Sequence, residues 1–481
     1  MRQNTRSSLN RPGQRQPSSI RRLGALLMVF TGAACARTGP VLSGIPSPAP
    51  VLPVPSAAQL AWETEERSAF LHFGMNTFTN KEIGDGTDSP TLFNPTALDA
   101  SQWITTLRGA GFRQAMLTAK HADGFCLWQT KCTSYSVAAS PFRGGQGDVV
   151  REFVDAAREG NLRVALALSP LDYHEPTYGT PAYAAVFECQ LTELLTNYGA
   201  VDEIWLWQQP SAPNLDWVTI HDLVHQLQPD ALLEMANLPP TTANDVHALF
   251  DSSPAGDQSS LQTPSNSPTT TDWIPAEWAY SIRPSWFWHA AEDSQVKSAS
   301  TLLGLYLGAV GRNSLLRLNV PPNTAGLLAD PDIAVLGQLG PNVGALYDTN
   351  VAAGRAATAD SVFDGLPAYD APSAFDGELD TYWAAAEGAT SGRLEVALDS
   401  ATSFDLISIQ EPIALGERTT QYHVDARVSG TWTTIATGTS IGERKLFSIN
   451  SVSADAVALV ITAARGAPAI SELGLYATGS P

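Results

Sequence analysis

Basic residues are scarce in this chain of 481 residues. It contains 28 lysines and arginines against 48 aspartates and glutamates, which gives a formal net charge of −20 at pH 7. Six of the arginines lie in residues 1–36, which contain no acidic residue, so the rest of the chain has 22 basic and 48 acidic residues. Nucleic acids and anionic lipid surfaces require a basic face, so neither is expected as a partner.

Cysteine is also scarce, with four residues in the whole chain. Cys35 lies near the N-terminus, and the other three are Cys126, Cys132 and Cys189. An odd number excludes a framework in which every cysteine is paired, and no Cys/His spacing is typical of zinc. A Cys126–Cys132 bridge is one reading, but we expect buried free thiols.

A membrane-spanning run is missing, although the N-terminal segment "SIRRLGALLMVFTGAACA" contains a short apolar stretch. Two arginines, an apolar run and small residues follow one another in the order of a secretory signal, and the run is too short to span a bilayer. Ala34-Cys35-Ala36 fits ordinary cleavage; alternatively, Cys35 is lipidated as in a bacterial lipoprotein. We therefore expect an exported protein that is periplasmic, extracellular or anchored through a lipid on Cys35. We expect no transmembrane span in the mature protein.

The remaining chain divides into a Pro/Ser-rich linker (37–58) and two domains, after a signal sequence (1–36). Over residues 59–350, apolar strands alternate with amphipathic helices such as "DVVREFVDAAREG", which predicts parallel βαβ units and a TIM-like (β/α)8 barrel. From 355 to 481, short strands alternate with turns, which predicts an all-β sandwich. In such barrels the chemistry lies at the carboxyl ends of the strands.

Five motifs in this order carry a family resemblance. They read "FLHFGMNTFTNKEIGDG", "TAKHADGFCLW", "GDVVREFVDAAREGNLRVALALSPLDYHEPTYGT", "SIRPSWFWH" and "GRNSLLRLNVPPNTAGLL". They resemble the α-L-fucosidases of glycoside hydrolase family 29, and the C-terminal part resembles the galactose-binding-like (discoidin, F5/8 type C) domain often attached to them. The resemblance implies a fucosylated oligosaccharide or glycoconjugate as partner. It also implies a retaining mechanism with an Asp nucleophile and a Glu acid/base.

The nucleophile is the main departure from the family pattern. The family strand Trp-Phe-Asp-Gly corresponds here to Trp205-Leu206-Trp207-Gln208. Side chains alternate along a strand, so Trp205 and Trp207 are expected on the same side. An indole cannot attack an anomeric carbon, and neither Asp202, Glu203 nor Asp216 is placed to replace the missing carboxylate. We therefore expect standard retaining hydrolysis to be lost or impaired.

The other site residues are assigned by resemblance. Glu277 is the candidate acid/base, and one of two adjacent fucose-contacting histidines of the family is Ala122 here. The substrate-binding candidates are His72, His121, Glu82, Trp205 and Arg283. For these the alternative is a structural role, as a satisfied core histidine, a loop charge or a packed indole. No cofactor is expected; Asp376 and Asp380 are candidates for a structural calcium ion in the C-terminal domain, with a solvated turn as the alternative.

Three functions remain open from the sequence. The first is an exported family member that recognises fucosylated glycans with hydrolysis lost or impaired, that is, a pseudo-enzyme. The second is an active α-L-fucosidase with a relocated carboxylate. The third is a non-catalytic, lectin-like protein that binds mainly through its sandwich domain.

Overall fold

A computed structural model describes residues 46–206, 215–235, 245–250, 257–262 and 271–478 of the chain. Residues 37–481 form one compact unit, and the predicted signal sequence lies outside the described residues. Within the described ranges, no helix combines the length and apolar character needed to cross a membrane.

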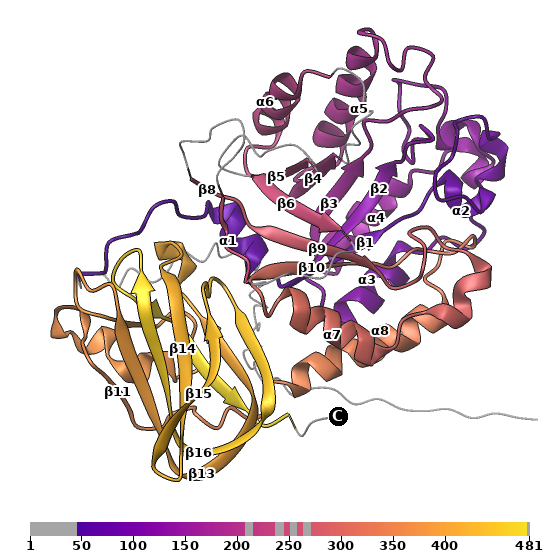
Figure 1. Ribbon diagram of the computed structural model, residues 1–481. Helices are drawn as coiled ribbons and strands as arrows, with labels where there is room; N and C mark the ends of the chain where they lie inside the picture. Colours follow the sequence, from indigo (N-terminus) through magenta and orange to yellow (C-terminus); the bar gives the residue numbers. More distant parts are fainter. Residues whose placement is uncertain (1–45, 207–214, 236–244, 251–256, 263–270, 479–481) are drawn as a thin grey trace, which may run out of the picture. The chain divides into compact units, whose positions relative to one another are not determined.

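Eight parallel strands close into a barrel in the first domain (Figure 1). Their order around the barrel is β1-β10-β9-β6-β5-β4-β3-β2. This confirms the predicted TIM-like domain. The strands are β1 (Arg67–Leu71), β2 (Gln114–Lys120), β3 (Arg163–Leu168), β4 (Glu203–Leu206), β5 (Leu232–Met235), β6 (Asp245–Phe250), β9 (Ala276–Ser281) and β10 (Ser314–Asn319).

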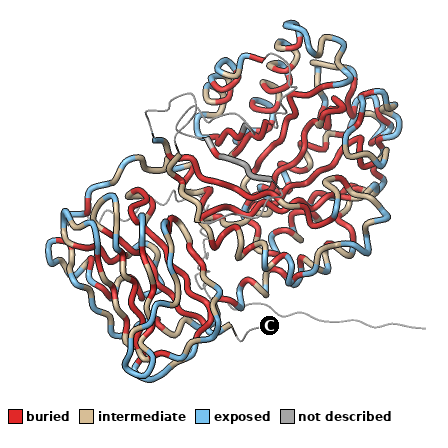
Figure 2. Tube along the Cα trace, viewed as in Figure 1, coloured by how far each residue is buried: buried red, intermediate tan, exposed pale blue. Residues whose placement is uncertain are grey.

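Helices follow most of these strands and cover the outside of the barrel. They are α3 (Ala100–Gly109), α4 (Val149–Glu159), α5 (Tyr183–Asn197), α6 (Trp217–Leu227), α7 (Ala299–Ala309) and α8 (Asp330–Ala345), with short helices α1 (Ala57–Glu63) and α2 (Met75–Thr79). In α4, the Asp148 side chain caps the first turn by accepting from the Arg151 N–H at 2.8 Å. Its buried residues share one face, as the 3.6-residue period predicts, and most strand residues with described burial are buried (Figure 2).

The inside of the barrel is built in layers, because every second residue of a strand points inward. At the amino ends, Trp62 of α1 packs with Leu232, Val246 and Leu315. The next layer is charged and centres on Arg317. Above it lies an apolar layer of Phe70, Met116, Ala165, Ala167 and Trp205. Two residues further along β1, His72 lies at the carboxyl end of the barrel.

The second domain is an antiparallel β domain, as expected. Its main sheet has the order β11-β13-β16-β14-β15, with β18 paired to β13. The strands are β11 (Ala357–Ala359), β13 (Gly392–Gln410), β14 (Thr419–Val428), β15 (Thr431–Gly438), β16 (Lys445–Ala464) and β18 (Glu472–Tyr476). A further pair in this domain is β12 (Trp383–Ala384) with β17 (Ala469–Ile470); in the first domain, β7 (Leu261–Gln262) pairs with β8 (Asp272–Trp273) between β6 and β9.

The cysteine prediction is wrong in one respect. Cys132 and Cys189 form a disulfide across 57 residues, with their Cα atoms 6.0 Å apart, while Cys126 is free and buried. Cys132 follows β2 and Cys189 lies in α5, the helix after the neighbouring strand β3, so the bridge joins two consecutive strand–helix units.

Part of the predicted linker is fixed by contacts with the antiparallel domain. The N–H of Val51 donates to the carbonyl of Leu415 at 2.8 Å, and Arg418 Nη2 donates to the carbonyl of Ala49 at 2.7 Å. Gly416 has φ +87°, and a Cβ there would lie 2.0 Å from the Val51 oxygen. Both the backbone angle and the close approach therefore require glycine at this position.

Candidate functional site

His72 is held at the carboxyl end of β1 by Asn319 of β10. Its Nδ1 lies 2.8 Å from Asn319 Oδ1. The amide nitrogen of Asn319 donates to Ser281 Oγ and to the Trp286 carbonyl, which fixes Oδ1 as an acceptor. Nδ1 of His72 therefore carries the proton in this bond, and Nε2 is the acceptor nitrogen of the neutral ring.

His121, which follows β2, has the opposite arrangement. The side-chain N–H of Asn76 lies 3.2 Å from His121 Nδ1 and also donates to the carbonyl of Glu82 at 3.1 Å. An amide NH₂ can only donate, so Nδ1 of His121 accepts and its Nε2 carries the proton. The two ring centroids are 6.2 Å apart. One ring thus provides an acceptor nitrogen and the other a donor nitrogen, which suits a sugar hydroxyl because a hydroxyl both donates and accepts.

Both histidines are kept neutral. Burial, and then the proximity of His121, lowers the pKa of His72 to about 3; burial lowers the pKa of His121 to about 4. Aromatic rings surround His72: Phe70, Trp286 and Phe287 lie 4.0, 5.2 and 5.5 Å from it, centroid to centroid. Trp286 is partly buried and places an indole beside the His72 ring. An aromatic ring in this position can pack against the apolar face of a sugar.

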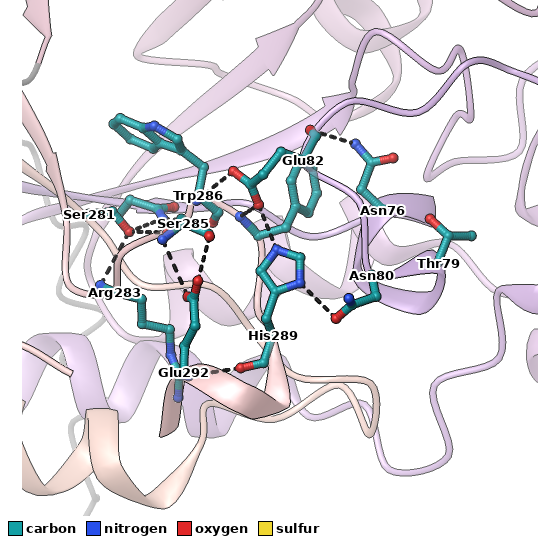
Figure 3. Close-up of polar contacts among 12 residues, drawn as sticks. Asn76, Thr79, Asn80, Glu82, Ser281, Arg283, Ser285, Trp286, His289 and Glu292 are labelled. Carbon is teal, nitrogen blue, oxygen red and sulfur yellow. Dashed lines mark hydrogen bonds and ion pairs between the residues drawn. The ribbon is translucent and has the colours of Figure 1, made fainter. Parts of the chain in front are cut away.

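Glu82 lies next to these rings but binds protein groups (Figure 3). Its carboxylate accepts from the backbone N–H groups of Trp286 and Phe287 at 2.8 and 3.0 Å. It also contacts Nε2 of His289 at 2.8 Å, and the other ring nitrogen of His289 lies 2.8 Å from Asn80 Oδ1. These contacts hold the loop after β9 against the loop after β1. The structure thus places Glu82 beside the candidate pocket, where it positions Trp286.

Arg283 is fully buried and lies in an ion pair. Its Nε and Nη2 donate to Asp332 of α8 at 2.9–3.1 Å, and Nη2 also contacts Asp293 at 2.9 Å. This arrangement fixes the loop after β9 to α8. In this structure the guanidinium binds carboxylates of the protein and does not point at the histidines.

Trp205 lies below the histidines, in the apolar layer. Its ring meets Phe70 edge to face, with centroids 5.2 Å apart, and only 6% of the residue is exposed. On its inner side the indole N–H is directed to the carboxyl of Glu234. Trp205 therefore belongs to the apolar layer between the histidines and the charged layer.

Glu277 lies in the charged layer, on the amino-terminal side of the apolar layer. Its two oxygens accept from Arg317 Nε at 2.8 and 2.7 Å, and Arg317 Nη2 donates to Glu203 at 2.6 Å. Glu203 also accepts from the Trp62 indole at 3.1 Å. Glu277 has no exposed surface, and burial raises the pKa of its carboxyl although Arg317 opposes this. Glu277 is thus part of an ion pair with Arg317 inside the barrel. Its acid/base role stays a prediction.

Glu234 adds a third carboxyl to the charged layer, which the sequence did not single out. Burial, and then the charge of Glu277, raises the pKa of Glu234 well above its ordinary value. The ligand oxygens of Glu203, Glu234 and Glu277 lie within 4.8 Å of one another. The guanidinium of Arg317 already supplies the cation for this group.

Trp207, the predicted replacement of the nucleophile, lies outside the described residues. Trp278 belongs to the outer hydrophobic core between strands and helices, because it alternates with inward-facing Glu277. Its position shows that not every indole of this region contributes to the pocket.

Two further acidic residues at the carboxyl end were not assigned to the site. Asp123, two residues after His121, accepts from the Phe125 N–H at 2.8 Å, and burial raises its pKa to about 7. Asp172 pairs with Lys120 at 3.0 Å, and both are buried. The motif "KHADGF" contains Lys120 and Asp123, but the sequence gives no sign of which of its polar residues would be buried.

The calcium candidates lie in different surroundings. Asp376 accepts from the Glu378 N–H and from Thr381 Oγ1, which makes it part of a turn. Asp380 is exposed. Across the described ranges, no group of three or more His, Cys, Asp or Glu ligands includes either residue. These two carboxylates do not form a calcium site by themselves.

Comparison with known proteins finds a family for each of two parts of the chain. The Alpha-L-fucosidase family matches residues 58–344, and the F5/8 type C domain matches residues 356–473. Among curated proteins, the Arabidopsis thaliana "Alpha-L-fucosidase 1" is 39% identical over 454 residues, which cover 90% of this chain and 89% of that protein.

Solved structures agree in fold along nearly the whole chain. A Ruminococcus gnavus GH29 fucosidase, solved in complex with fucose, is 29% identical with a TM-score of 0.82 and covers 92% of this chain and 97% of its own. The structure of SpGH29 is 31% identical with a TM-score of 0.80 and covers 90% and 99%, respectively.

Proposed function

Because this chain belongs to the α-L-fucosidase family, we propose that it recognises α-L-fucosylated glycans at the carboxyl end of its barrel while standard retaining hydrolysis is lost or impaired. The observation that carries this proposal is the tryptophan at position 207, where the family pattern has the nucleophilic aspartate. Recognition and catalysis use different groups, so one can persist without the other.

The histidine pair supports recognition. The ring centroids of His72 and His121 are 6.2 Å apart, burial lowers the pKa of both, and Nε2 of His72 is an acceptor nitrogen. Trp286 adds an aromatic ring held in place by Glu82. A relative of the same fold and family was solved with fucose, which makes fucose the first sugar to test here.

The carboxyl groups of the described residues support the loss of hydrolysis. Retaining hydrolysis needs two carboxyls about 5–5.5 Å apart on either side of the glycosidic bond. At the carboxyl end, the carboxylate of Glu82 binds two backbone amides, Asp123 binds one, and Asp172 pairs with Lys120. Glu277 lies below the Trp205 layer in contact with Arg317. Each of these groups already has a structural contact.

The disulfide supports the expectation of export. Disulfides persist mainly in oxidising compartments, and Cys132–Cys189 occurs in a chain that begins with a signal-like segment. We propose that the mature protein acts in the periplasm, outside the cell, or anchored through lipid on Cys35.

An active fucosidase with a relocated carboxylate is the second candidate. It is favoured by the 39% identity to the Arabidopsis protein over nine-tenths of the chain, and by Asp123, whose pKa of about 7 would suit proton transfer beside His121. In that case a carboxylate other than residue 207 forms the covalent intermediate.

Two measurements on the full chain separate the candidates. The first is titration with L-fucose, for which we expect saturable binding that is lost in His72→Ala and retained in His423→Ala, a matched change in the antiparallel domain. The second is incubation with a 2-fluoro-fucosyl fluoride, followed by intact mass and peptide mapping. We expect no covalent label; a labelled carboxylate would establish the second candidate, and absence of fucose binding would refute the first.

A further inference from the structure

A cavity of about 400 Å³ lies between α1 and the antiparallel domain, away from the carboxyl end of the barrel. We call it the α1 cavity. One wall is α1 with the segment before it, and the other consists of the 379–382 turn, the end of β13 and the 411–415 loop. Its volume falls in the range of small-molecule sites, which often lie where domains meet.

The two faces of α1 have separate functions. Gln59, Trp62 and Glu63 are buried against the barrel, where Trp62 closes the charged layer. Residues 57, 60 and 64 are spaced i, i+3 and i+7, so they share the other face, and all three line the cavity. The capping box between Ser56 and Gln59 fixes where this helix begins. The wall is therefore a preformed element.

Gln410 provides the observation that points to a ligand. Only 3% of this residue is exposed, and it lines the cavity. Its carbonyl accepts from Ser471, but across the described residues its side-chain amide makes no hydrogen bond. Its neighbour Glu411 differs, because both carboxylate oxygens of Glu411 accept from backbone N–H groups of Arg418, Thr419 and Gly442. The amide therefore keeps its hydrogen-bonding capacity although the residue is almost completely covered, and a molecule in the cavity could bind to it.

The rest of the lining indicates what kind of ligand fits. Besides Gln410, the lining includes the acidic residues Asp380, Glu411 and Glu443, the aromatic residue Tyr382, and the apolar residues Ile413 and Leu415. No lysine or arginine lines it among the described residues, so an anion is disfavoured. An amide that donates and accepts, an accepting carboxylate and an aromatic ring together match a molecule with several hydroxyls and an apolar face.

We propose that the α1 cavity binds one residue of a neutral sugar, with the Gln410 side-chain amide as its central hydrogen-bonding group. This site is separate from the histidine pair and does not depend on whether the barrel hydrolyses anything. A glycan held here would be bound both by the family domain and by the antiparallel domain.

The substitution Gln410→Leu tests the proposal without relying on loss of folding. It removes an amide that has no protein partner, so the melting temperature should stay the same or rise, while affinity for the sugar should fall about tenfold or more. Titrations would use L-fucose, D-galactose and D-glucose, with D-glucuronate and D-glucosamine as charged comparisons. Gln338→Leu, a change at an exposed glutamine of α8, is the matched control and should leave affinity unchanged.

The site must also be located, because the barrel can bind a sugar as well. A neutral sugar carrying a diazirine, followed by irradiation and peptide mapping, should label residues 57–64 or 410–415, and this label should persist in His72→Ala but decrease in Gln410→Leu. Labelling confined to the carboxyl end of the barrel would overturn the proposal. So would a Gln410→Leu variant that binds every tested sugar like the wild type, or a wild type that binds none.

Discussion

The substitution Glu277→Ala should destabilise the barrel by about 3–5 kcal/mol, because it leaves a buried charge without one of its partners. Arg317 is 1% exposed, and Glu277 holds its Nε through both carboxylate oxygens. Glu203 still accepts from Arg317 Nη2 at 2.6 Å in this variant, so we expect a loss near the lower end of that range.

The variant Glu277→Gln separates the charge from the volume of the side chain. Glutamine keeps the shape and one accepting oxygen but removes the negative charge, so we expect a loss of about 1.5–3 kcal/mol, the contribution of a hydrogen bond to a charged group. Urea unfolding followed by tryptophan fluorescence gives both values. Glu159→Ala, at an exposed position of α4, is the control and should stay within about 0.5 kcal/mol of the wild type.

The opposite result would show that Glu277 acts in catalysis. If Glu277→Gln unfolds like the wild type but abolishes turnover of a fucoside, the carboxyl is not needed by Arg317 and must reach the substrate in solution. The structural role assigned to the charged layer would then be refuted.

Two further predictions concern the disulfide and pH. Replacing both Cys132 and Cys189 with serine should lower the free energy of unfolding by about 4 kcal/mol, because a bridge across 57 residues constrains the unfolded chain. A reductant should destabilise the wild type but not this variant. Equal free energies of unfolding for the wild type and the variant would contradict this prediction. The pKa of His72 falls from 6.5 in the unfolded chain to about 3 in the fold, so only the unfolded state binds this proton in between, and stability decreases as the pH falls from 6.5. Urea unfolding should therefore show that, between pH 6 and 4, the free energy of unfolding of the wild type falls by about 1.4 kcal/mol per pH unit more than that of His72→Asn. If the free energies of both proteins change equally with pH, the ring is not buried in its neutral form.

The sequence predicted the parts of the fold that depend on local patterns. Alternation of continuous apolar strands with amphipathic helices specified the parallel barrel, and short strands with turns specified the antiparallel domain. His72 and His121 were predicted for the same reason, since both follow buried strands and the carboxyl ends of parallel strands meet.

The remaining features depend on which distant side chains meet, and local patterns do not contain that information. Glu277 finds Arg317 on the adjacent strand, 40 residues later, and Cys132 finds Cys189 across 57 residues. The contact of α1 with the charged layer could not be predicted either. In the sequence Trp62 looks like an ordinary apolar residue of a short helix, and only the closed barrel brings it to Glu203.

The most direct test of the account measures release from an aryl α-L-fucoside by the wild type and by Trp207→Asp, with L-fucose binding measured in parallel. We predict that the wild type binds fucose without measurable turnover and that Trp207→Asp gains activity, since it restores the carboxylate of the family pattern. Turnover by the wild type at a rate that Trp207→Asp does not exceed would contradict it, because another group would then be attacking the sugar.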